Sequence, residues 1–182
     1  AAAAEARRSL RINPLWLRAL VLNGDPQDLA LLLTASRSDS WVEQRAAIEA
    51  LGLWPDASAL PRLLSVFRDN QSPYQTHAGE ALAQGAPATA AKAMEAIAAD
   101  LNSTSASERA RALYWLARAP AAAGNALALK ALDDPDPAVR QLADWVLRRR
   151  TGLDAGYDFQ APAGQREAAI QRWRELLAPG PR

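Results

Sequence analysis

The chain has 182 residues, and its 21 basic and 20 acidic side chains leave a formal net charge of +1. This length fits one domain with a buried core, while the near-zero charge argues against a duplex-binding domain, which usually carries a clear basic excess. The absence of cysteine excludes disulfides, thiolate zinc sites and cysteine nucleophiles, and no apolar run approaches the roughly 20 residues of a membrane span.

The residue types that dominate the chain favour helix. Alanine occupies almost a quarter of the positions, and 19 of the 21 basic residues are arginine. Alanine, leucine and arginine are strong helix formers, whereas valine and isoleucine, which favour strands, are scarce. The composition therefore predicts an all-α fold.

The first 24 residues predict two helices that cap the N-terminal end of the domain. The break falls near Asn13-Pro14, because proline suits the first turn of a helix and disfavours helical geometry in the residue before it. Residues 15–22 are apolar on almost every side, which predicts a buried second helix. Asn23-Gly24 predicts its end.

Residues 25–150 repeat a two-helix pattern four times, in predicted units 25–54, 55–86, 87–119 and 120–150. A proline opens each unit, where it suits a helix N-terminus; these prolines are Pro26, Pro55, Pro87 and Pro120. The first helix of each unit then has an apolar face. Its members are Leu29, Leu32 and Leu33; Leu60, Leu63, Leu64 and Phe67; Met94, Ile97 and Leu101; and Leu127, Leu129 and Leu132.

The second helices of the four units share their anchor residues. A leucine recurs at intervals of 31, 34 and 31 residues, as Leu51, Leu82, Leu116 and Leu147. Four residues before each leucine stands alanine, as Ala47, Ala78, Ala112 and Ala143. Seven residues before each stands Gln44, Gln75, Arg109 or Arg140. We expect the alanine to permit close approach of a neighbouring helix and the leucine to fill the space beside it.

Helix-capping residues recur with the anchors and support the repeat independently. Ser40 with Glu43, and Ser105 with Glu108, match the Ser-x-x-Glu capping box, in which the two side chains satisfy each other's backbone N–H groups.

Two other second helices are predicted to start with a cap followed by proline, at Asp136-Pro137 and at Ser72-Pro73. Periodic anchors and periodic caps agree, so the sequence predicts an array of helical hairpins. One hairpin cannot bury its own apolar face, and stacked neighbours form a continuous core.

Residues 134–147 closely resemble the HEAT or HEAT-like repeat, a helical hairpin with an Asp-rich turn followed by Val-Arg-x-x-Ala-x-x-x-Leu. Residues 42–52 resemble it loosely, the third unit keeps the arginine, alanine and leucine, and the second lacks the arginine. The resemblance covers residues 25–150. It implies an α-solenoid of stacked antiparallel hairpins with helical caps at both ends, and a turn aspartate paired with a second-helix arginine, here Asp134 with Arg140.

The segment after residue 150 predicts a C-terminal cap. Thr151-Gly152 predicts a helix end, and Gly156-Tyr157-Asp158-Phe159 an ordered loop. A last helix is predicted over about 163–177, with Ala169, Ile170, Trp173, Leu176 and Leu177 on one side. This tail resembles the ends of some bacterial HEAT-like chains, which favours a capping role.

Neither the single histidine nor the acidic turn predicts chemistry. His77 lies about 140° from Leu82 around its helix, which predicts a surface side chain. A HEAT-like di-iron hydroxylase uses repeated His-Glu pairs, but alanine follows His77 and no second histidine exists. Asp136 is explained as a cap and Asp134 by the implied arginine pair. We expect no metal site, no cofactor and no catalytic residues.

In HEAT arrays the second helices line the concave surface, so the resemblance implies a binding face opposite the anchors. Its predicted members are Arg45, Glu49, His77, Glu80, Arg111, Tyr114, Gln141 and Trp145. This face is acidic and polar at its N-terminal end and aromatic at its C-terminal end, and exposed Trp, Tyr and Arg are typical of binding hot spots. The alternative is that the C-terminal tail covers Tyr114 and Trp145, through Tyr157 or Trp173.

Two classes of function follow. The first is a non-catalytic interaction or scaffold module that binds a peptide or protein segment on this face. The second is a HEAT-like alkylpurine DNA glycosylase, in which Trp145 beside Asp144 or Glu80 would face a flipped base. The near-zero charge disfavours nucleic acid.

Two further possibilities rest on analogy. Phycobilisome-type chromophore lyases contain related repeats, but nothing marks a bilin site. The chain begins Ala-Ala-Ala-Ala-Glu. This favours one domain of a longer protein, with a structural spacer as one role, over a processed secreted product. Its compartment is left open.

Overall fold

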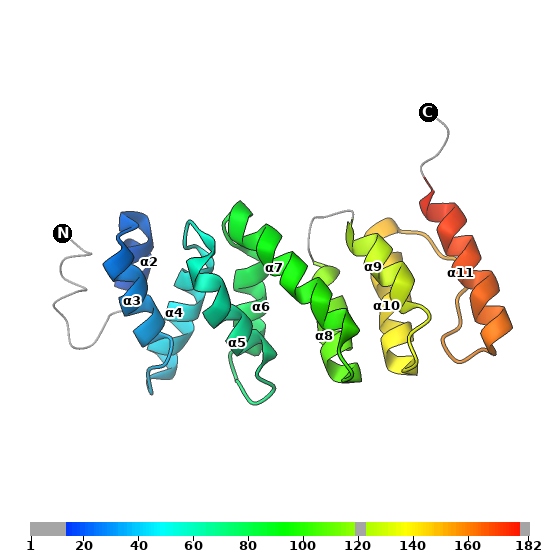
Figure 1. Ribbon diagram of the computed structural model, residues 1–182, viewed down its shortest axis with the longest axis horizontal. Helices are drawn as coiled ribbons and strands as arrows, with labels where there is room; N and C mark the ends of the chain where they lie inside the picture. The colour runs from blue at the N-terminus through cyan, green and yellow to red at the C-terminus, as the bar shows by residue number, and fades with distance from the viewer. Residues whose placement is uncertain (1–13, 119–122, 179–182) are drawn as a thin grey trace. The chain divides into compact units, whose positions relative to one another are not determined.

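The computed structural model describes residues 14–118 and 123–178 and is all-helical over those ranges (Figure 1). This confirms the predicted all-α class. The α-helices are α2 (Pro14–Asn23), α3 (Pro26–Ala35), α4 (Trp41–Gly52), α5 (Leu60–Arg68), α6 (Gln75–Gln84), α7 (Pro87–Ala99), α8 (Ala106–Leu116), α9 (Ala123–Ala131), α10 (Pro137–Thr151) and α11 (Ala163–Leu177). Two short 3-10 helices, η1 (Ala57–Ala59) and η2 (Asp100–Asn102), precede α5 and follow α7. None of the described helices is long and apolar enough to cross a membrane.

The chain divides into two compact units, with the boundary after Glu95, inside α7. In unit 1, α2 packs on α3 and α4, α3 packs on α4, and α6 packs on both α4 and α5. In unit 2, α10 packs on α8 and α9, and α11 contacts α9. Each unit is therefore built from hairpins that pack on their neighbours along the chain.

The predicted anchors of the second helices are buried. The four leucines and the four alanines that precede them are at most 1% exposed: Leu51, Leu82, Leu116, Leu147, Ala47, Ala78, Ala112 and Ala143. In each unit at least one apolar residue predicted for the first helix is also almost completely buried, namely Leu32, Leu63 with Phe67, Ile97, and Leu132, which directly follows α9. Hydrophobic periodicity thus identified the core side of every repeat.

A close helix contact in unit 1 depends on two glycines. A Cβ at Gly52 would lie 2.6 Å from the Cβ and 2.9 Å from the Cα of Ala81, and a Cβ at Gly85 would lie 2.6 Å from the carbonyl oxygen of Gly52. The C-terminal ends of α4 and α6 therefore approach more closely than any side chain at these positions allows.

The N-terminal part of the described chain agrees with expectation except at Leu22. Helix α2 begins at Pro14 and ends at Asn23, and Gly24 follows with φ +66°. Leu17 and Leu20 are fully buried, but Leu22 is 90% exposed. The expected all-round burial is wrong, because only one side of α2 faces α3 and α4. The helix predicted before Asn13 lies outside the described residues.

Two of the four unit-opening prolines start a helix, Pro26 in α3 and Pro87 in α7. Pro55 instead precedes η1, and Pro120 lies outside the described residues.

The predicted N-cap at Asp136 is confirmed, since its Oδ1 accepts from the backbone N–H of Ala138 and Val139. The cap predicted at Ser72 is wrong, because α6 begins only at Gln75.

The reciprocal capping boxes are also wrong in detail. Ser40 accepts from the N–H of Glu43 at 3.5 Å, but the Glu43 carboxylate accepts from Ser38 Oγ at 2.7 Å rather than from the backbone of Ser40. The N–H of Ser40 donates to Ser38 Oγ at 3.2 Å. Ser38 therefore relays the hydrogen bond that the capping box would form directly between the Ser40 N–H and the Glu43 carboxylate.

The same serine relay recurs before α8. Ser103 Oγ accepts from the N–H of Ser105 at 3.0 Å and donates to the carboxylate of Glu108. The pattern Ser-x-Ser-x-x-Glu is common to both turns. At the equivalent position of the other two turns, Asp69 accepts from the N–H of Gln71 and Asp134 from that of Asp136. In every one of these turns, the side chain 13 residues before the anchor leucine therefore accepts a hydrogen bond from the backbone N–H two residues later.

Candidate functional site

Helices α8 and α10 lie side by side in unit 2 and run parallel. At their N-terminal ends, Arg109 binds the carboxylate of Asp134, in the turn before α10. At their C-terminal ends, Nη1 of Arg150 donates to the carbonyl oxygen of Leu116 at 3.0 Å. Residues at equivalent repeat positions, such as Tyr114 and Trp145, therefore lie beside one another.

Tyr114 and Trp145 project away from the core and stay exposed. Their exposed fractions are 36% and 42%, although each belongs to a helix whose opposite side is fully buried. The two aromatic rings line a shallow depression of about 310 Å³, together with Ala138, Gln141 and Leu142. This volume is at the lower end of the range of ligand pockets, which is enough room for one or two side chains of a bound segment.

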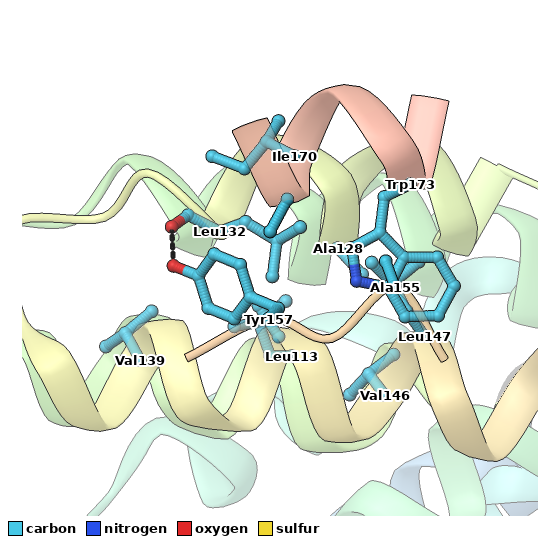
Figure 2. Close-up of a cluster of buried hydrophobic side chains, with 12 residues drawn as sticks. Leu113, Ala128, Leu132, Val139, Val146, Leu147, Ala155, Tyr157, Ile170 and Trp173 are labelled. Carbon is cyan, nitrogen blue, oxygen red and sulfur yellow. Dashed lines mark hydrogen bonds between the residues drawn. The ribbon is translucent and has the colours of Figure 1, made fainter. Parts of the chain in front are cut away.

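The C-terminal tail does not cover these aromatic residues with Tyr157 or Trp173. Both belong to the buried core of unit 2, where they are 6% and 0% exposed (Figure 2). The Tyr157 hydroxyl donates to the carbonyl oxygen of Leu132. The alternative in which these two residues shield Trp145 is therefore wrong.

An arginine one helical turn after each exposed aromatic residue lies against its ring. The guanidinium carbon of Arg118 is 4.5 Å from the centroid of Tyr114, and that of Arg149 is 5.4 Å from the centroid of Trp145. Arg118 also donates to the Tyr114 hydroxyl and lies 5.0 Å from the ring of Trp115. Such contacts hold a cation over an aromatic face. Neither arginine lines the depression itself, but each lies against one of the two rings that do.

The acidic turn before α10 is structural, but its arginine partner differs from the expected one. The carboxylate of Asp134 binds Arg109 of the preceding repeat, through Nε–Oδ2 at 2.7 Å and Nη2–Oδ1 at 2.8 Å. Arg140 instead donates to the backbone carbonyl of Asp134 at 2.8 Å and to that of Phe159. The expected side-chain pair of Asp134 with Arg140 is wrong.

Arg109 and Arg140 each bind their own turn and the structural element that follows it. Nη1 of Arg109 donates to the carbonyl oxygens of Ser103 and Thr104, and Nη1 of Arg140 donates to the equivalent carbonyls in its own turn. The other side of each guanidinium reaches the next structural element, Asp134 for Arg109 and the loop at Phe159 for Arg140. Each arginine therefore fastens its own turn to the following one.

The tail is bound to α10 through a buried carboxylate. Nε1 of Trp173 donates to Oδ1 of Asp144 at 3.0 Å, and Nε of Arg148 donates to Oδ2 at 2.6 Å. Burial raises the pKa of Asp144, and the hydrogen bond from Trp173 and the charge of Arg148 offset this only in part. Asp144 thus faces the core while its neighbour Trp145 faces outward. The arrangement proposed for a DNA glycosylase, with this carboxylate beside an exposed Trp145, is not formed.

The predicted face residues of unit 1 line two other depressions. Arg45 and Glu49 form an ion pair of 2.8 Å on α4 and, with the 66% exposed Trp41, line one of them. Glu49, His77 and Glu80 line a second, together with Arg18. His77 is only half-buried, but its Nδ1 is inaccessible and has no hydrogen-bond partner among the described residues. His77 therefore lies at the surface but is only partly exposed.

In unit 2 the structure brings together three of the four predicted face residues. Tyr114, Gln141 and Trp145 share one depression, whereas Arg111 is not among its lining residues. Sequence reasoning missed Arg118 and Arg149, although an aromatic residue followed four positions later by arginine is a readable helical signal. Within the described ranges, no three histidine, aspartate or glutamate side chains converge as a metal site would require.

Compared with models of known protein families and with curated protein sequences, the chain matches none.

Proposed function

We propose that this chain is a HEAT-like α-solenoid module without catalysis of its own, and that it binds a peptide or protein segment on the exposed side of α8 and α10. The repeat register supports the solenoid and the family. Four second helices share their buried leucine and alanine anchors, and all four turns are closed by the side chain 13 residues before the leucine.

The observation that carries the binding role is the depression between Tyr114 and Trp145. Two exposed aromatic rings that line one depression form a contiguous apolar surface, and such surfaces mark interaction sites more than scattered exposed residues do. Tryptophan and tyrosine are also enriched among the hot spots of protein interfaces. The lining is mainly apolar: Ala138 and Leu142 complete it with the two rings, and Gln141 is the polar member. An extended segment that places one apolar side chain there would bury these surfaces.

Panning a library of short random peptides, displayed on phage, against the full chain tests this function. We expect enriched peptides that bind the wild type and lose binding to Tyr114→Ala and Trp145→Ala. Removing a hot-spot aromatic residue costs typically about 2 kcal/mol or more, which corresponds to roughly thirtyfold in affinity. Trp41→Ala is the matched control, because it removes an exposed tryptophan from α4 in unit 1.

Far-UV circular dichroism and thermal melting accompany these measurements. Because Tyr114 and Trp145 are exposed, both variants should keep the helicity and the melting temperature of the wild type. Peptides that bind the double variant as tightly as the wild type would contradict the proposal. So would unfolding of both variants, since that would make the two residues part of the core.

A further inference from the structure

The exposed side of unit 2 has an unusual arrangement of charge around its aromatic residues. Tyr114 on α8 and Trp145 on α10 each stand two residues before an anchor leucine. Arg118, in the turn that follows α8, and Arg149, on α10, each stand two residues after that leucine. Because α8 and α10 run parallel, the two rings line the same depression, and each guanidinium lies against its own ring. We call these four residues the aromatic-arginine patch.

Both arginines of the patch lack a carboxylate partner among the described residues. Arg118 contacts the rings of Tyr114 and Trp115 and the Tyr114 hydroxyl, and Arg149 contacts the ring of Trp145. In contrast, the neighbouring Arg148 is bound by the carboxylates of Asp144 and Asp154. The two positive charges beside the rings of the depression therefore have no ion-pair partner within the described ranges.

Unit 1 differs from unit 2 at the same repeat positions. Glu49 and Glu80 stand two residues before their anchors, and Leu53 and Gln84 two after them. Trp41 and Arg45 on α4 also combine an exposed ring with an arginine, but they stand at other repeat positions, and Arg45 is paired with Glu49 at 2.8 Å. An aromatic residue and an arginine at these two repeat positions therefore occur together only in the third and fourth repeats, although the net charge of the whole chain is only +1. A ligand selected by charge complementarity would bind at the patch and would be negative.

We infer that the segment bound by unit 2 is an acidic peptide, with an apolar side chain that enters the depression between Tyr114 and Trp145 and carboxylates that reach Arg118 and Arg149. This inference rests on the proposed function and specifies its partner. The guanidinium groups are already oriented by their rings, so they lose little side-chain entropy on binding a carboxylate. Planar guanidinium donors also match carboxylate oxygens in pairs.

The chemistry of the patch favours a peptide over a nucleic acid. Nucleic-acid affinity depends on many phosphate contacts along a continuous basic surface. The patch supplies two arginines, and the depression between the rings is lined by small and aliphatic side chains, Ala138 and Leu142. One apolar side chain flanked by carboxylates uses all of these groups together.

The test uses the peptides enriched by panning the full chain against the displayed random library. We expect them to combine aspartate or glutamate with leucine, isoleucine or an aromatic residue. Fluorescence anisotropy then compares one enriched peptide with its Asn/Gln counterpart and with a labelled single-stranded oligonucleotide. The acidic peptide should bind at least about fivefold more tightly than its neutral counterpart, and raising the ionic strength from roughly 0.02 to 0.15 M should weaken it.

Charge reversal at the patch provides the second arm. Arg118→Glu and Arg149→Glu should each lower the affinity for the acidic peptide by about fivefold or more. The affinity for the neutral counterpart should stay unchanged. Lys130→Glu is the matched control, because it makes the same change in net charge on α9 while leaving all four residues of the patch unaltered. Arg118→Lys should retain part of the binding.

The outcomes separate this inference from the proposed function. Enriched peptides that need Tyr114 and Trp145 but are neutral or basic would overturn the acidic partner and leave the binding module intact. Absence of any enrichment over the Tyr114→Ala/Trp145→Ala variant would overturn both. Tight binding of the oligonucleotide, lost on Arg118→Glu, with no enrichment of acidic peptides, would assign the patch to nucleic acid instead.

Discussion

The guanidinium of Arg109 binds both carboxylate oxygens of Asp134, 25 residues further along the chain, at 2.7 and 2.8 Å. Both side chains are at least 90% buried. This bidentate pair joins the turn before α8 to the turn before α10, and the N–H of Asp136 donates to the same carboxylate. It therefore links successive repeats of unit 2, rather than the two ends of one turn.

Arg109→Ala should lower the melting temperature by roughly 5–10 °C, since it leaves the buried carboxylate of Asp134 without its main partner. Asp134→Ala should have a similar effect. The double variant should be less destabilised than the sum of the two, because the second change removes a group already unpaired. Calorimetry or thermal melts followed by circular dichroism measure this coupling, and strictly additive effects would show that the pair is not energetically linked.

The Asp134 pair should also make stability sensitive to acid. Burial alone would raise the pKa of Asp134, but hydrogen bonds from Arg109 and Asp136 and the charges of Arg109 and Arg140 together hold it below the ordinary value of 3.8. A carboxyl with a lowered folded-state pKa stabilises the fold above its unfolded pKa, and this contribution is lost as pH falls below 3.8 toward the folded value. The free energies of unfolding of the wild type and Asp134→Asn, measured in urea, should differ most near neutral pH and converge in that acidic range.

The contribution of Asp144 to stability should change with pH in the opposite direction to that of Asp134. Because burial raises its folded-state pKa, the charged form carries a cost in the fold, and the wild type should gain stability relative to Asp144→Asn as pH falls from neutral toward 3.8. Asparagine at this position keeps an oxygen acceptor for Nε1 of Trp173. Chemical unfolding over this pH range measures the free energies of unfolding of the two proteins. If Asp144→Asn instead became more stable relative to the wild type as pH falls, the raised pKa of Asp144 would be contradicted.

Removing the acceptor altogether should be more damaging. Asp144→Ala leaves the indole N–H of the fully buried Trp173 without its partner, at a cost of about 1–3 kcal/mol. Urea unfolding at neutral pH is the measurement. Asp144→Asn is the matched control, and equal destabilisation by both would show that the hydrogen bond to Trp173 contributes nothing.

Gly52→Ala should destabilise unit 1 even though alanine is the better helix former. The new methyl would meet the Cβ and the backbone of Ala81, which forces α4 and α6 apart. Overpacking of this kind costs typically about 1–3 kcal/mol. Gly164→Ala on α11 is the control, because no atom lies within 4 Å of a Cβ there, and it should be neutral or slightly stabilising. Urea unfolding curves of the two variants should shift in opposite directions or differ clearly in size.

Much of the helical architecture was readable because it depends on local chemistry. The periodic leucines and alanines predicted which side of each second helix is buried, and α11 covers the predicted range 163–177. Asp136-Pro137 predicted the start of α10 because a side-chain acceptor and a proline act within one helical turn. The position of Trp145 opposite Leu147 also followed from helical geometry, and its exposure agrees.

The pairing of polar groups between repeats was not readable in the same way. Two arginines, Arg109 and Arg140, stand at repeat positions from which they could pair with Asp134, and the family resemblance implies the nearer one, Arg140. Which guanidinium reaches the carboxylate depends on the distance between successive hairpins, because Arg109 approaches from the neighbouring helix. The serine relay at Ser38 and Ser103 was missed for a related reason, since the competing acceptor lies just outside the expected capping box.

By itself, the sequence determined the all-helical class, the register of the hairpins and the side of each helix that faces the core, because all three follow from the spacing of residues along one helix. Only the tertiary structure decided that Tyr157 and Trp173 are buried while Tyr114 and Trp145 remain exposed, and that Arg118 and Arg149 lie against the exposed rings. These choices depend on the packing of the C-terminal tail and of the parallel helices α8 and α10, which no single-helix periodicity encodes.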